Sequence, residues 1–307
     1  MTEQKVWDVI VTGAGPSGLT VGIYTARARR EVLILERLAP GGLINLTEMV
    51  ENYPGFEKGI KGHELAQAME NQATRLGTKI ERALVEKVEL SDSLKIVHAE
   101  SKVYRAKTLV VASGTNPKRL KVSGELKFMG RGVSTCAICD GPFFRDKVVG
   151  IIGGGDSAAQ EAIYLARLAN EVHLVHRRDQ LRAVKEIQEK AFAMQNIKFH
   201  WNRVVVSIDG DEKVKSVILK DAQTGETERL ELDGLFIYIG LVPNTEFLAG
   251  LPIATDDQGF VITNENMETN IPGIYAVGDV RSKKLRQVST AVGDGAIAAF
   301  DLEKYLG

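Results

Sequence analysis

Residues 9–18 read Val-Ile-Val-Thr-Gly-Ala-Gly-Pro-Ser-Gly, and residues 148–158 read Val-Val-Gly-Ile-Ile-Gly-Gly-Gly-Asp-Ser-Ala. Each stretch has the form Gly-x-Gly-x-x-Gly/Ala after an apolar run, which predicts a strand, a tight turn and a helix that bind a dinucleotide. The first glycine makes the turn, the second lets a pyrophosphate approach the backbone, and the third position packs helix on strand. The helix N-terminus offers N–H donors to the phosphates. The predicted contacts are Gly13, Gly15, Pro16, Ser17 and Gly18 in the first copy and Gly153, Gly155, Asp156, Ser157 and Ala158 in the second.

The residue that ends the second strand of each unit differs between the two copies. Counting 23 residues on from the first glycine reaches Glu36 in one copy and His176 in the other. An acid at this place binds the ribose hydroxyls of an adenosine, whereas cations bind a 2′-phosphate. Arg177 and Arg178 follow His176, and Arg182 is able to lie on the same side of a following helical turn. The first copy therefore predicts an FAD or NAD site and the second an NADPH site, the alternative being that the arginines only solvate a helix start.

Composition narrows the class of protein. The chain has 307 residues, a length typical of about two domains, and 44% of them are hydrophobic, enough for buried cores. The net charge of −1 produces no overall field that would attract nucleic acid or an anionic membrane. No apolar run approaches the roughly 18 residues of a membrane helix, and the polar residues 1–5 leave no room for a signal peptide. We therefore expect a soluble cytoplasmic protein that binds neither nucleic acid nor membrane.

The order of apolar runs and helical patterns predicts an α/β fold with parallel sheets and right-handed crossovers. A smaller antiparallel layer is expected from strands at 80–90 and 94–104. Further elements are expected as helices over 62–76 and from about 292, and as strands over 108–112, 198–207, 213–220, 234–240 and 271–279.

The last segment of the chain is expected to return to the first nucleotide unit, because residues 240–244 already close the second. We therefore predict two Rossmann-like, three-layer ββα domains, the second inserted into the first. The predicted boundaries are 1–115 and 245–307 for the outer domain and 116–244 for the inserted one. In this arrangement Asp279 can reach hydroxyls of a flavin, or it can cap the helix that follows.

Cys136 and Cys139 are the only cysteines of the chain, which rules out a four-cysteine zinc site. None of the five histidines lies within 30 residues of the pair. A structural disulfide across two residues removes little chain entropy, and cytosolic proteins seldom keep one. A redox pair is therefore favoured over an inert disulfide. Asp140 can exchange a proton with a sulfur, or it can cap the turn at Gly141.

Together these motifs resemble the low-molecular-weight thioredoxin reductases over essentially the full chain. The matching segments are residues 13–18, 51–55 (Glu-Asn-Tyr-Pro-Gly), 131–141 (Arg-Gly-Val-Ser-Thr-Cys-Ala-Ile-Cys-Asp-Gly), 153–158, 176–178 with Arg182, 273–279 (Gly-Ile-Tyr-Ala-Val-Gly-Asp) and 286–288 (Arg-Gln-Val). The resemblance implies that NADPH bound to the inserted domain reduces FAD bound to the outer domain. It implies further flavin contacts at Gly42, Asn52, Gly114, Gly278, Asp279, Arg286, Gln287 and Val288.

The resemblance also implies how the dithiol works. The flavin reduces the Cys136–Cys139 disulfide, with Cys139 toward the flavin, and Cys136 then exchanges with thioredoxin or a thioredoxin-like protein. It implies a homodimer through the outer domains, and rotation of the inserted domain about linkers near 114–118 and 241–246. Arg131, Phe143 and Phe144 are expected to form a docking patch beside the thiol, unless the two rings fill the core.

Three other activities are compatible with parts of the sequence. A ferredoxin-driven disulfide reductase would share the fold and the dithiol but would have no need of the arginines at 177 and 178. A reductase for a peroxidase would usually carry an extra N-terminal disulfide domain. A flavin-bearing binding protein without turnover would not need Cys136, Cys139 and Asp140 together.

Overall fold

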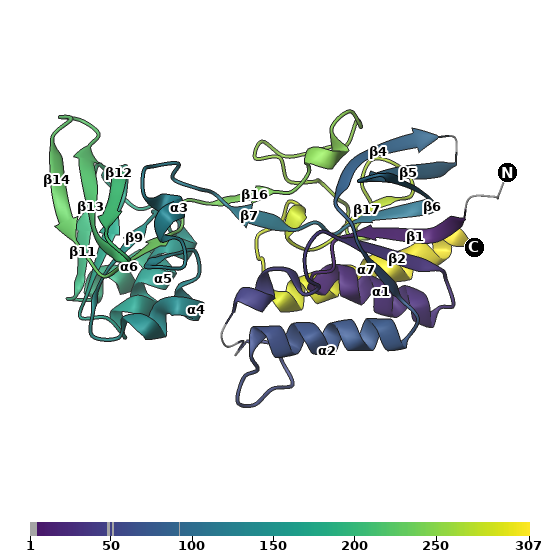
Figure 1. Ribbon diagram of the computed structural model, residues 1–307, viewed down its shortest axis with the longest axis horizontal. Coiled ribbons are helices and arrows are strands. Elements are labelled where there is room, and N and C mark those ends of the chain that lie inside the picture. Colours follow the sequence, from purple (N-terminus) through teal and green to yellow (C-terminus); the bar gives the residue numbers. More distant parts are fainter. Residues whose placement is uncertain (1–4, 48–49, 51, 92) are drawn as a thin grey trace. The chain divides into compact units, whose positions relative to one another are not determined.

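The computed structural model describes residues 5–47, 50, 52–91 and 93–307, and the side chains of these apart from Leu46 and Cys139. The chain divides into two compact units (Figure 1). The outer unit comprises Met1–Asn116 and Val242–Gly307, and the inserted unit comprises Pro117–Leu241. The division therefore lies one residue after the first predicted boundary and three residues before the second.

The outer unit is built on a seven-stranded sheet in the order β3-β2-β1-β6-β5-β4, with β17 also paired to β6. Its strands are β1 (Val6–Thr12), β2 (Val32–Glu36), β3 (Lys79–Arg82), β4 (Val85–Ser91), β5 (Leu94–Ala99), β6 (Lys102–Val111) and β17 (Ile274–Ala276). All neighbours pair in parallel except β4 with β5 and β5 with β6.

Each of the two segments predicted as antiparallel strands contains parts of two strands. The segment 94–104 contains β5 and the start of β6, and β6 continues through most of the predicted strand 108–112. The segment 80–90 contains two strands, because β3 pairs in parallel with β2 and β4 pairs with β5. The long strand β6 pairs with β5 in its first half and with β17 in its second half. The antiparallel strands are therefore hydrogen-bonded to the main sheet through β6, which sequence spacing did not reveal.

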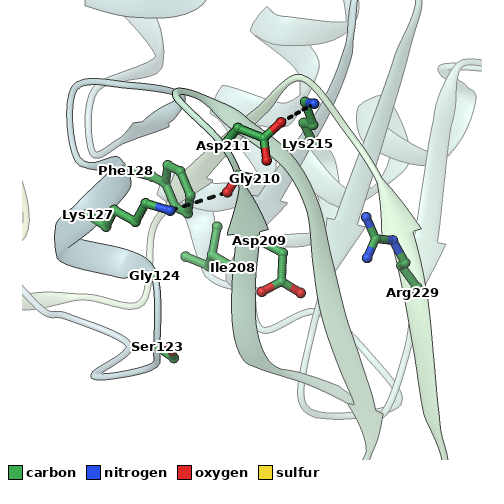
Figure 2. A pocket seen from close by; sticks show the side chains of 10 residues that line it. All are labelled: Ser123, Gly124, Lys127, Phe128, Ile208, Asp209, Gly210, Asp211, Lys215 and Arg229. Atoms are coloured by element: carbon green, nitrogen blue, oxygen red, sulfur yellow. Dashed lines mark hydrogen bonds and ion pairs between the residues drawn. The ribbon is translucent and has the colours of Figure 1, made fainter.

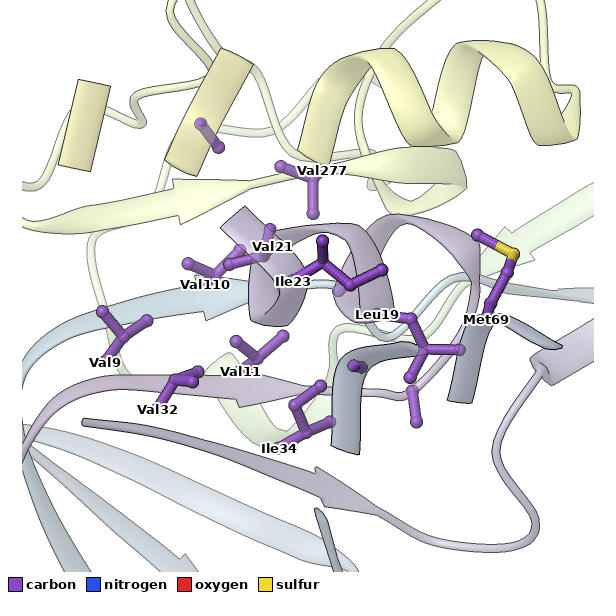
Figure 3. Close-up of a cluster of buried hydrophobic side chains, with 14 of the residues drawn as sticks. Val9, Val11, Leu19, Val21, Ile23, Val32, Ile34, Met69, Val110 and Val277 are labelled. Atoms are coloured by element: carbon purple, nitrogen blue, oxygen red, sulfur yellow. The ribbon is translucent and has the colours of Figure 1, made fainter. Parts of the chain in front are cut away.

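Both faces of this sheet are buried, as parallel sheets require. Val9 and Val11 belong to one apolar cluster, whereas Ile10 between them belongs to the cluster on the other face. In the first cluster the strands pack against α1 (Pro16–Arg27), and Figure 3 shows Leu19, Val21 and Ile23 among them. The cluster also takes in α2 (Gly62–Arg75) and α7 (Val288–Leu306). Helix α7 thus begins four residues before the predicted position.

The inserted unit has a five-stranded parallel sheet in the order β11-β10-β9-β15-β8. Its strands are β8 (Val133–Ser134), β9 (Val148–Ile152), β10 (Glu171–Val175), β11 (Ile197–His200) and β15 (Gly234–Ile237), and its longer helices are α5 (Asp156–Ala166) and α6 (Lys185–Ala193). A separate antiparallel sheet contains β12 (Arg203–Gly210), β13 (Val214–Asp221) and β14 (Thr227–Glu231).

Two details of this unit depart from the expectation. The predicted strand 198–207 is broken where Asn202 adopts a positive φ of 53°, so β11 and β12 join different sheets. Strand β14 was not predicted, because its charged residues are mostly exposed and carry no apolar alternation.

The two connections between the units, β7 (Thr115–Pro117) and β16 (Leu241–Pro243), pair with each other as a two-stranded sheet. Among the helices that the structure describes, none is both long enough and apolar enough to cross a membrane.

Candidate functional site

The glycines of the first fingerprint differ in what a side chain would meet at each position. Gly13 has a φ of +103°, and a Cβ there would lie 2.5 Å from the carbonyl oxygen of Ala112. A Cβ on Gly18 would lie 2.0 Å from the carbonyl oxygen of Gly13. At Gly15, which precedes Pro16 at the start of α1, a Cβ would meet no described atom within 4 Å. The protein's own packing therefore does not demand glycine at position 15, whereas a pyrophosphate against the backbone would.

The second fingerprint repeats this pattern in the inserted unit. A Cβ on Gly153 would lie 2.4 Å from the carbonyl oxygen of Tyr238 and 2.6 Å from the Cβ of Ala158. A Cβ on Gly155 would meet none of the described atoms within 4 Å, and the neighbouring Ser157 is exposed. Two loops with the same crowded first glycine and the same open second glycine thus fit one dinucleotide each.

Glu36, at the end of β2, braces the first loop. Its Oε2 accepts a hydrogen bond of 2.7 Å from the N–H of Ala14, and its Oε1 accepts one of 2.8 Å from Leu38. Gly42, with a φ of +60°, lies against the loop, since its Cβ would be 3.3 Å from the Cα of Gly15. Glu36 and Gly42 are therefore both brought to the fingerprint.

Asp279 supplies the clearest sign of a missing partner in the outer unit. It follows Gly278, whose Cβ would lie 2.5 Å from Oγ of Ser17 in α1. Its Oδ1 is buried and has no hydrogen-bond partner among the described residues, since Nζ of Lys283, 4.0 Å away, forms an ion pair with it but lies too far for a hydrogen bond. Burial raises the pKa of this carboxyl, and the positive charges of Lys283 and Arg286 only partly offset that rise. A hydroxyl donor from a bound flavin would satisfy this oxygen.

The capping alternative for Asp279 does not occur in the structure. Asp279 lies within the short helical turn η4 (Gly278–Val280), whose N-cap is Val277 without a side-chain cap. The backbone carbonyl of Asp279 accepts a bond of 3.2 Å from Nε of Arg286. Arg286 also stacks 4.0 Å from the ring centre of Phe260, and burial lowers the pKa of its guanidinium.

The remaining predicted flavin residues lie at the start of α7 and near the first connection. Gln287 caps α7, and its Oε1 accepts a bond of 2.9 Å from Nδ2 of Asn52. Val288 is the first residue of that helix. The carbonyl of Gly114 accepts the N–H of Asn244 at 3.0 Å. In the motif 51–55, residue 51 lies outside the described residues.

Asp294 was not among the predicted site residues, but it holds the turn that carries Asp279. Its Oδ2 accepts the N–H of Gly278 at 3.0 Å and lies 2.8 Å from Nζ of Lys283, and its Oδ1 lies 2.9 Å from Arg281. The only signal was a single carboxylate inside the Ala- and Gly-rich run of α7.

The arginines of the second unit are placed by a loop and not by a helical turn. Arg177, Arg178 and Arg182 are all exposed. No helix spans residues 177–184, so the expectation that Arg182 shares a helical turn with Arg178 is wrong. The N–H of Arg182 instead donates a bond of 2.6 Å to the carbonyl of Gly154 in the fingerprint. No spacing of residues in the sequence predicts such a contact, because it depends on how the loop folds back onto the fingerprint.

His176 is buried, with 5% of its surface exposed, under the loop that carries the arginines. A Cβ on Gly154 would lie 2.2 Å from its ring. Burial lowers the pKa of His176, and the positive charges of Arg182, Arg177 and Arg178 lower it further. Burial therefore favours the neutral imidazole, and the exposed arginines supply the positive charge of this site. Asp156 ties the same loop down, since its Oδ1 accepts the N–H of Val184 at 2.8 Å.

Cys136 is disulfide-bonded and precedes α4 (Ala137–Asp140), a single helical turn. Its N–H donates to Oγ of Ser134 at 3.0 Å, and its carbonyl accepts the N–H of Asp140 at 3.1 Å. The side chain of Cys139 lies outside the described part of the structure. Asp140 is the N-cap of η2 (Gly141–Phe144) but makes no side-chain cap bond. The carboxylate of Asp140 therefore does not cap this turn, which was the alternative to a role in proton exchange.

The two phenylalanines after the dithiol have opposite environments. Phe143 is 70% exposed. Phe144 packs edge-on against Phe236, with ring centres 5.4 Å apart, and occupies the space where a Cβ on Gly234 would lie. Arg131 is exposed. The docking and core interpretations thus each fit one of the two rings.

A pocket of about 530 Å³ lies elsewhere on the inserted unit, between α3 (Glu125–Phe128) and the antiparallel sheet (Figure 2). Two of its lysines are engaged, Lys215 with Asp211 at 2.5 Å and Lys127 with the carbonyl of Gly210 at 3.3 Å. It contains none of the predicted site residues. The described residues also include no cluster of three or more side chains suited to a metal ion.

Known proteins resemble this chain over its full length. Residues 7–295 match the pyridine nucleotide-disulphide oxidoreductase family. The thioredoxin reductase of Bacillus subtilis is 45% identical over 307 residues, which are 100% of this chain and 96% of that protein. The structure of Lactococcus lactis thioredoxin reductase covers 98% of this chain and 99% of its own, with a TM-score of 0.81 and 45% identity.

A ferredoxin-flavin thioredoxin reductase from Clostridium acetobutylicum is less similar, with a TM-score of 0.54 and 32% identity over 98% of this chain and 99% of its own. Membership of the matched family implies a flavin and a nicotinamide dinucleotide as cofactors. The chain belongs to the pyridine nucleotide-disulphide oxidoreductase family, among its low-molecular-weight thioredoxin reductases.

Proposed function

We propose that this protein transfers electrons from NADPH, through FAD and the Cys136–Cys139 pair, to the disulfide of thioredoxin or a thioredoxin-like protein. The observation that carries the proposal is a chain with two open dinucleotide loops and a two-cysteine turn, 45% identical over its full length to a thioredoxin reductase. A bound flavin would supply the two-electron step between nicotinamide and disulfide.

The outer unit has the groups that FAD requires. The bare backbone at Gly15 and the start of α1 would receive the pyrophosphate. Glu36, already fixed by the Ala14 N–H, would accept a ribose hydroxyl. The unsatisfied Oδ1 of Asp279 would accept a hydroxyl of the ribityl chain.

The inserted unit has the groups that NADPH requires. The bare backbone at Gly155 and the start of α5 would receive the second pyrophosphate. Arg177 and Arg178 are exposed beside the strand end, and Arg182 is held to the fingerprint through its backbone. Their guanidinium groups would bind the 2′-phosphate.

At the dithiol, Sγ of Cys136 would attack the partner's disulfide to form a mixed disulfide, which Sγ of Cys139 then resolves. Asp140, whose side chain makes no cap bond, would give a proton to a sulfur and take it back. Cys139 and Gly153 are 14 residues apart within one unit, yet both the thiol pair and the nicotinamide must reach the same flavin. We therefore propose that the inserted unit rotates about the β7 and β16 connections during turnover.

NADPH-dependent reduction of a panel of small disulfide proteins tests this function. We expect thioredoxin to be reduced with NADPH as the only electron source. Reduction that needs reduced ferredoxin and ignores NADPH would instead support the ferredoxin-driven alternative. If NADPH bleaches the flavin but no disulfide protein is reduced, the protein is a flavoprotein with another function and the proposal is wrong.

The two phenylalanines allow a separate prediction about the partner surface. We expect Phe143→Ala to raise KM for the protein disulfide with thermal stability nearly unchanged, because an exposed ring can contact a partner. We expect Phe144→Ala to lower the unfolding free energy by less than the roughly 3–5 kcal/mol of a fully buried phenylalanine, because its ring is half-buried against the core. Steady-state kinetics and denaturant titration measure both. An unaltered KM in Phe143→Ala would remove this ring from the docking surface.

We also propose a homodimer through the outer units. Helices α1 and α7 pack on each other, yet Tyr24, Ile297 and Phe300 remain exposed, Phe300 by 67%. Apolar side chains of this size are typical of subunit interfaces. Light scattering should give a dimer for the unmodified chain and a monomer for Phe300→Glu; a monomeric unmodified chain would contradict the proposal.

A further inference from the structure

Glu161 is a half-buried residue with one buried carboxyl oxygen, and the proposed mechanism gives it no role. It lies in the second turn of α5, and its Oε2 is buried without a hydrogen-bond partner in the described part of the chain. Burial raises the pKa of Glu161 to about 7. An unpaired buried carboxyl costs stability, so its place in the molecule calls for an explanation.

Glu161 lies on the face of α5 that meets the dithiol turn. Tyr164 and Leu165, three and four residues further along, share that face of the helix. A Cβ on Gly141, the residue after α4, would lie 3.1 Å from the ring of Tyr164 and 3.2 Å from Cδ2 of Leu165. The helical turn after Cys136 therefore packs on the same face of α5 as Glu161.

Tyr238 connects the two sites electrostatically. Its hydroxyl accepts a hydrogen bond of 2.7 Å from the N–H of Ala137, the residue that follows Cys136. Burial raises the pKa of Tyr238, and the charges of Glu161 and Asp140 raise it further. The charge of a carboxylate at position 161 therefore acts on the Tyr238 hydroxyl, which is hydrogen-bonded to the dithiol turn.

We propose that Glu161 is a proton-binding site linked to the redox state of the dithiol: it takes up a proton from water when the disulfide is reduced and releases it on oxidation. This inference rests on the proposed function for the Cys136–Cys139 pair. Tyr238, after β15, is the titratable group whose pKa responds to the charge of Glu161. The elements packed against α5 are α4, α6, β9, β10 and β11. None of their described charged groups, including Asp140 on α4, Glu171 and His173 on β10 and Lys198 and His200 on β11, contributes to the shift, which has burial as its cause.

The charge balance gives the direction of the linkage. Reduction breaks the S–S bond with two electrons and one proton from the reductant, leaving one thiol and one thiolate. The new negative charge arises on the turn that contains Cys136, whose neighbour Ala137 bonds to Tyr238, the residue on which the charge of Glu161 acts. Across Tyr238, the new charge raises the pKa of Glu161. Between the pKa values of the oxidised and reduced forms, Glu161 therefore binds one proton from water on reduction. When the partner's disulfide takes the two electrons and one proton, the thiolate disappears and Glu161 releases its proton to water.

Equilibrium titration of the flavin-loaded protein in dithiothreitol buffers tests the linkage without NADPH or a protein partner. Thiols are counted by alkylation and mass shift, at pH values on either side of about 7. Above that pH, we expect the equilibrium constant for reduction to fall by up to about tenfold more per pH unit in the unmodified protein than in Glu161→Gln. For a two-electron couple this is about 30 mV per pH unit.

Glu186→Gln is the matched control, because Glu186 is an exposed carboxyl of the same unit paired with Lys190. It should keep the pH dependence of the unmodified protein. The same pH dependence in the unmodified protein and in Glu161→Gln would overturn the proposal.

Infrared difference spectra of the unmodified protein give a second readout that needs no variant. Reduction slightly above pH 7 should add the C=O band of a protonated carboxyl, and the absence of that band overturns the linkage. Failure of NADPH-driven thioredoxin reduction with a normal dithiothreitol titration would count against the proposed function alone. A disulfide that does not titrate at all would overturn both.

Discussion

Cys136→Ser and Cys139→Ser are each expected to lower thioredoxin reduction by at least about 10³-fold, the scale of loss when a reacting nucleophile is removed. Exchange needs one sulfur to attack and the other to resolve the mixed disulfide, so neither cysteine suffices alone. Both variants should keep hydride transfer from NADPH to the flavin, because the nucleotide loops are untouched. Stopped-flow reduction of the flavin and steady-state thioredoxin reduction measure the two steps separately.

The two variants should differ in their spectra. Only the variant that keeps Cys139 should show a long-wavelength thiolate–flavin absorbance, because that band requires a sulfur against the flavin ring. If the band appears when Cys136 alone remains, the roles of the two cysteines must be exchanged. Full disulfide-reductase activity in either variant would remove the dithiol from the mechanism.

Replacing Arg177 and Arg178 by glutamine together is expected to reduce the preference for NADPH over NADH by a factor of about a hundred or more. Each charge-assisted hydrogen bond contributes roughly 1.5–3 kcal/mol, and two of them are lost. The change should appear mainly as a higher KM for NADPH, with the rate at saturation nearly unchanged. Ratios of kcat/KM for the two coenzymes measure it.

Arg167→Gln is the matched control for this pair. Arg167 is exposed on the same unit but lies at the C-cap of α5, the end opposite the fingerprint. It should leave the coenzyme preference unchanged. Equal use of NADPH and NADH by the unmodified protein would contradict the assignment of the second nucleotide site.

The order of the elements in the outer and inserted units could be predicted because it rests on short-range patterns. Alternating apolar residues place Val9 and Val11 on one face of β1 and Ile10 on the other, whichever strands lie beside it. The crowding of Gly18 against Gly13 arises within six residues of chain. The boundaries of β6 were not predictable in this way, because they depend on its pairing with the distant strands β1 and β17. Strand β14 carries no apolar alternation, so only its pairing with β13 reveals it.

Sequence also determined the type of chemistry, since two dinucleotide fingerprints and a lone Cys-x-x-Cys require only local order. Which side chains are buried was decided by tertiary structure, because burial depends on residues far apart in the chain. His176 is buried against Gly154, and its burial lowers its pKa. Phe144 packs on Phe236, whereas Phe143 stays exposed. Glu161 acquires its raised pKa for the same reason: it is enclosed by packing that no local pattern encodes, and desolvation penalises its charged form.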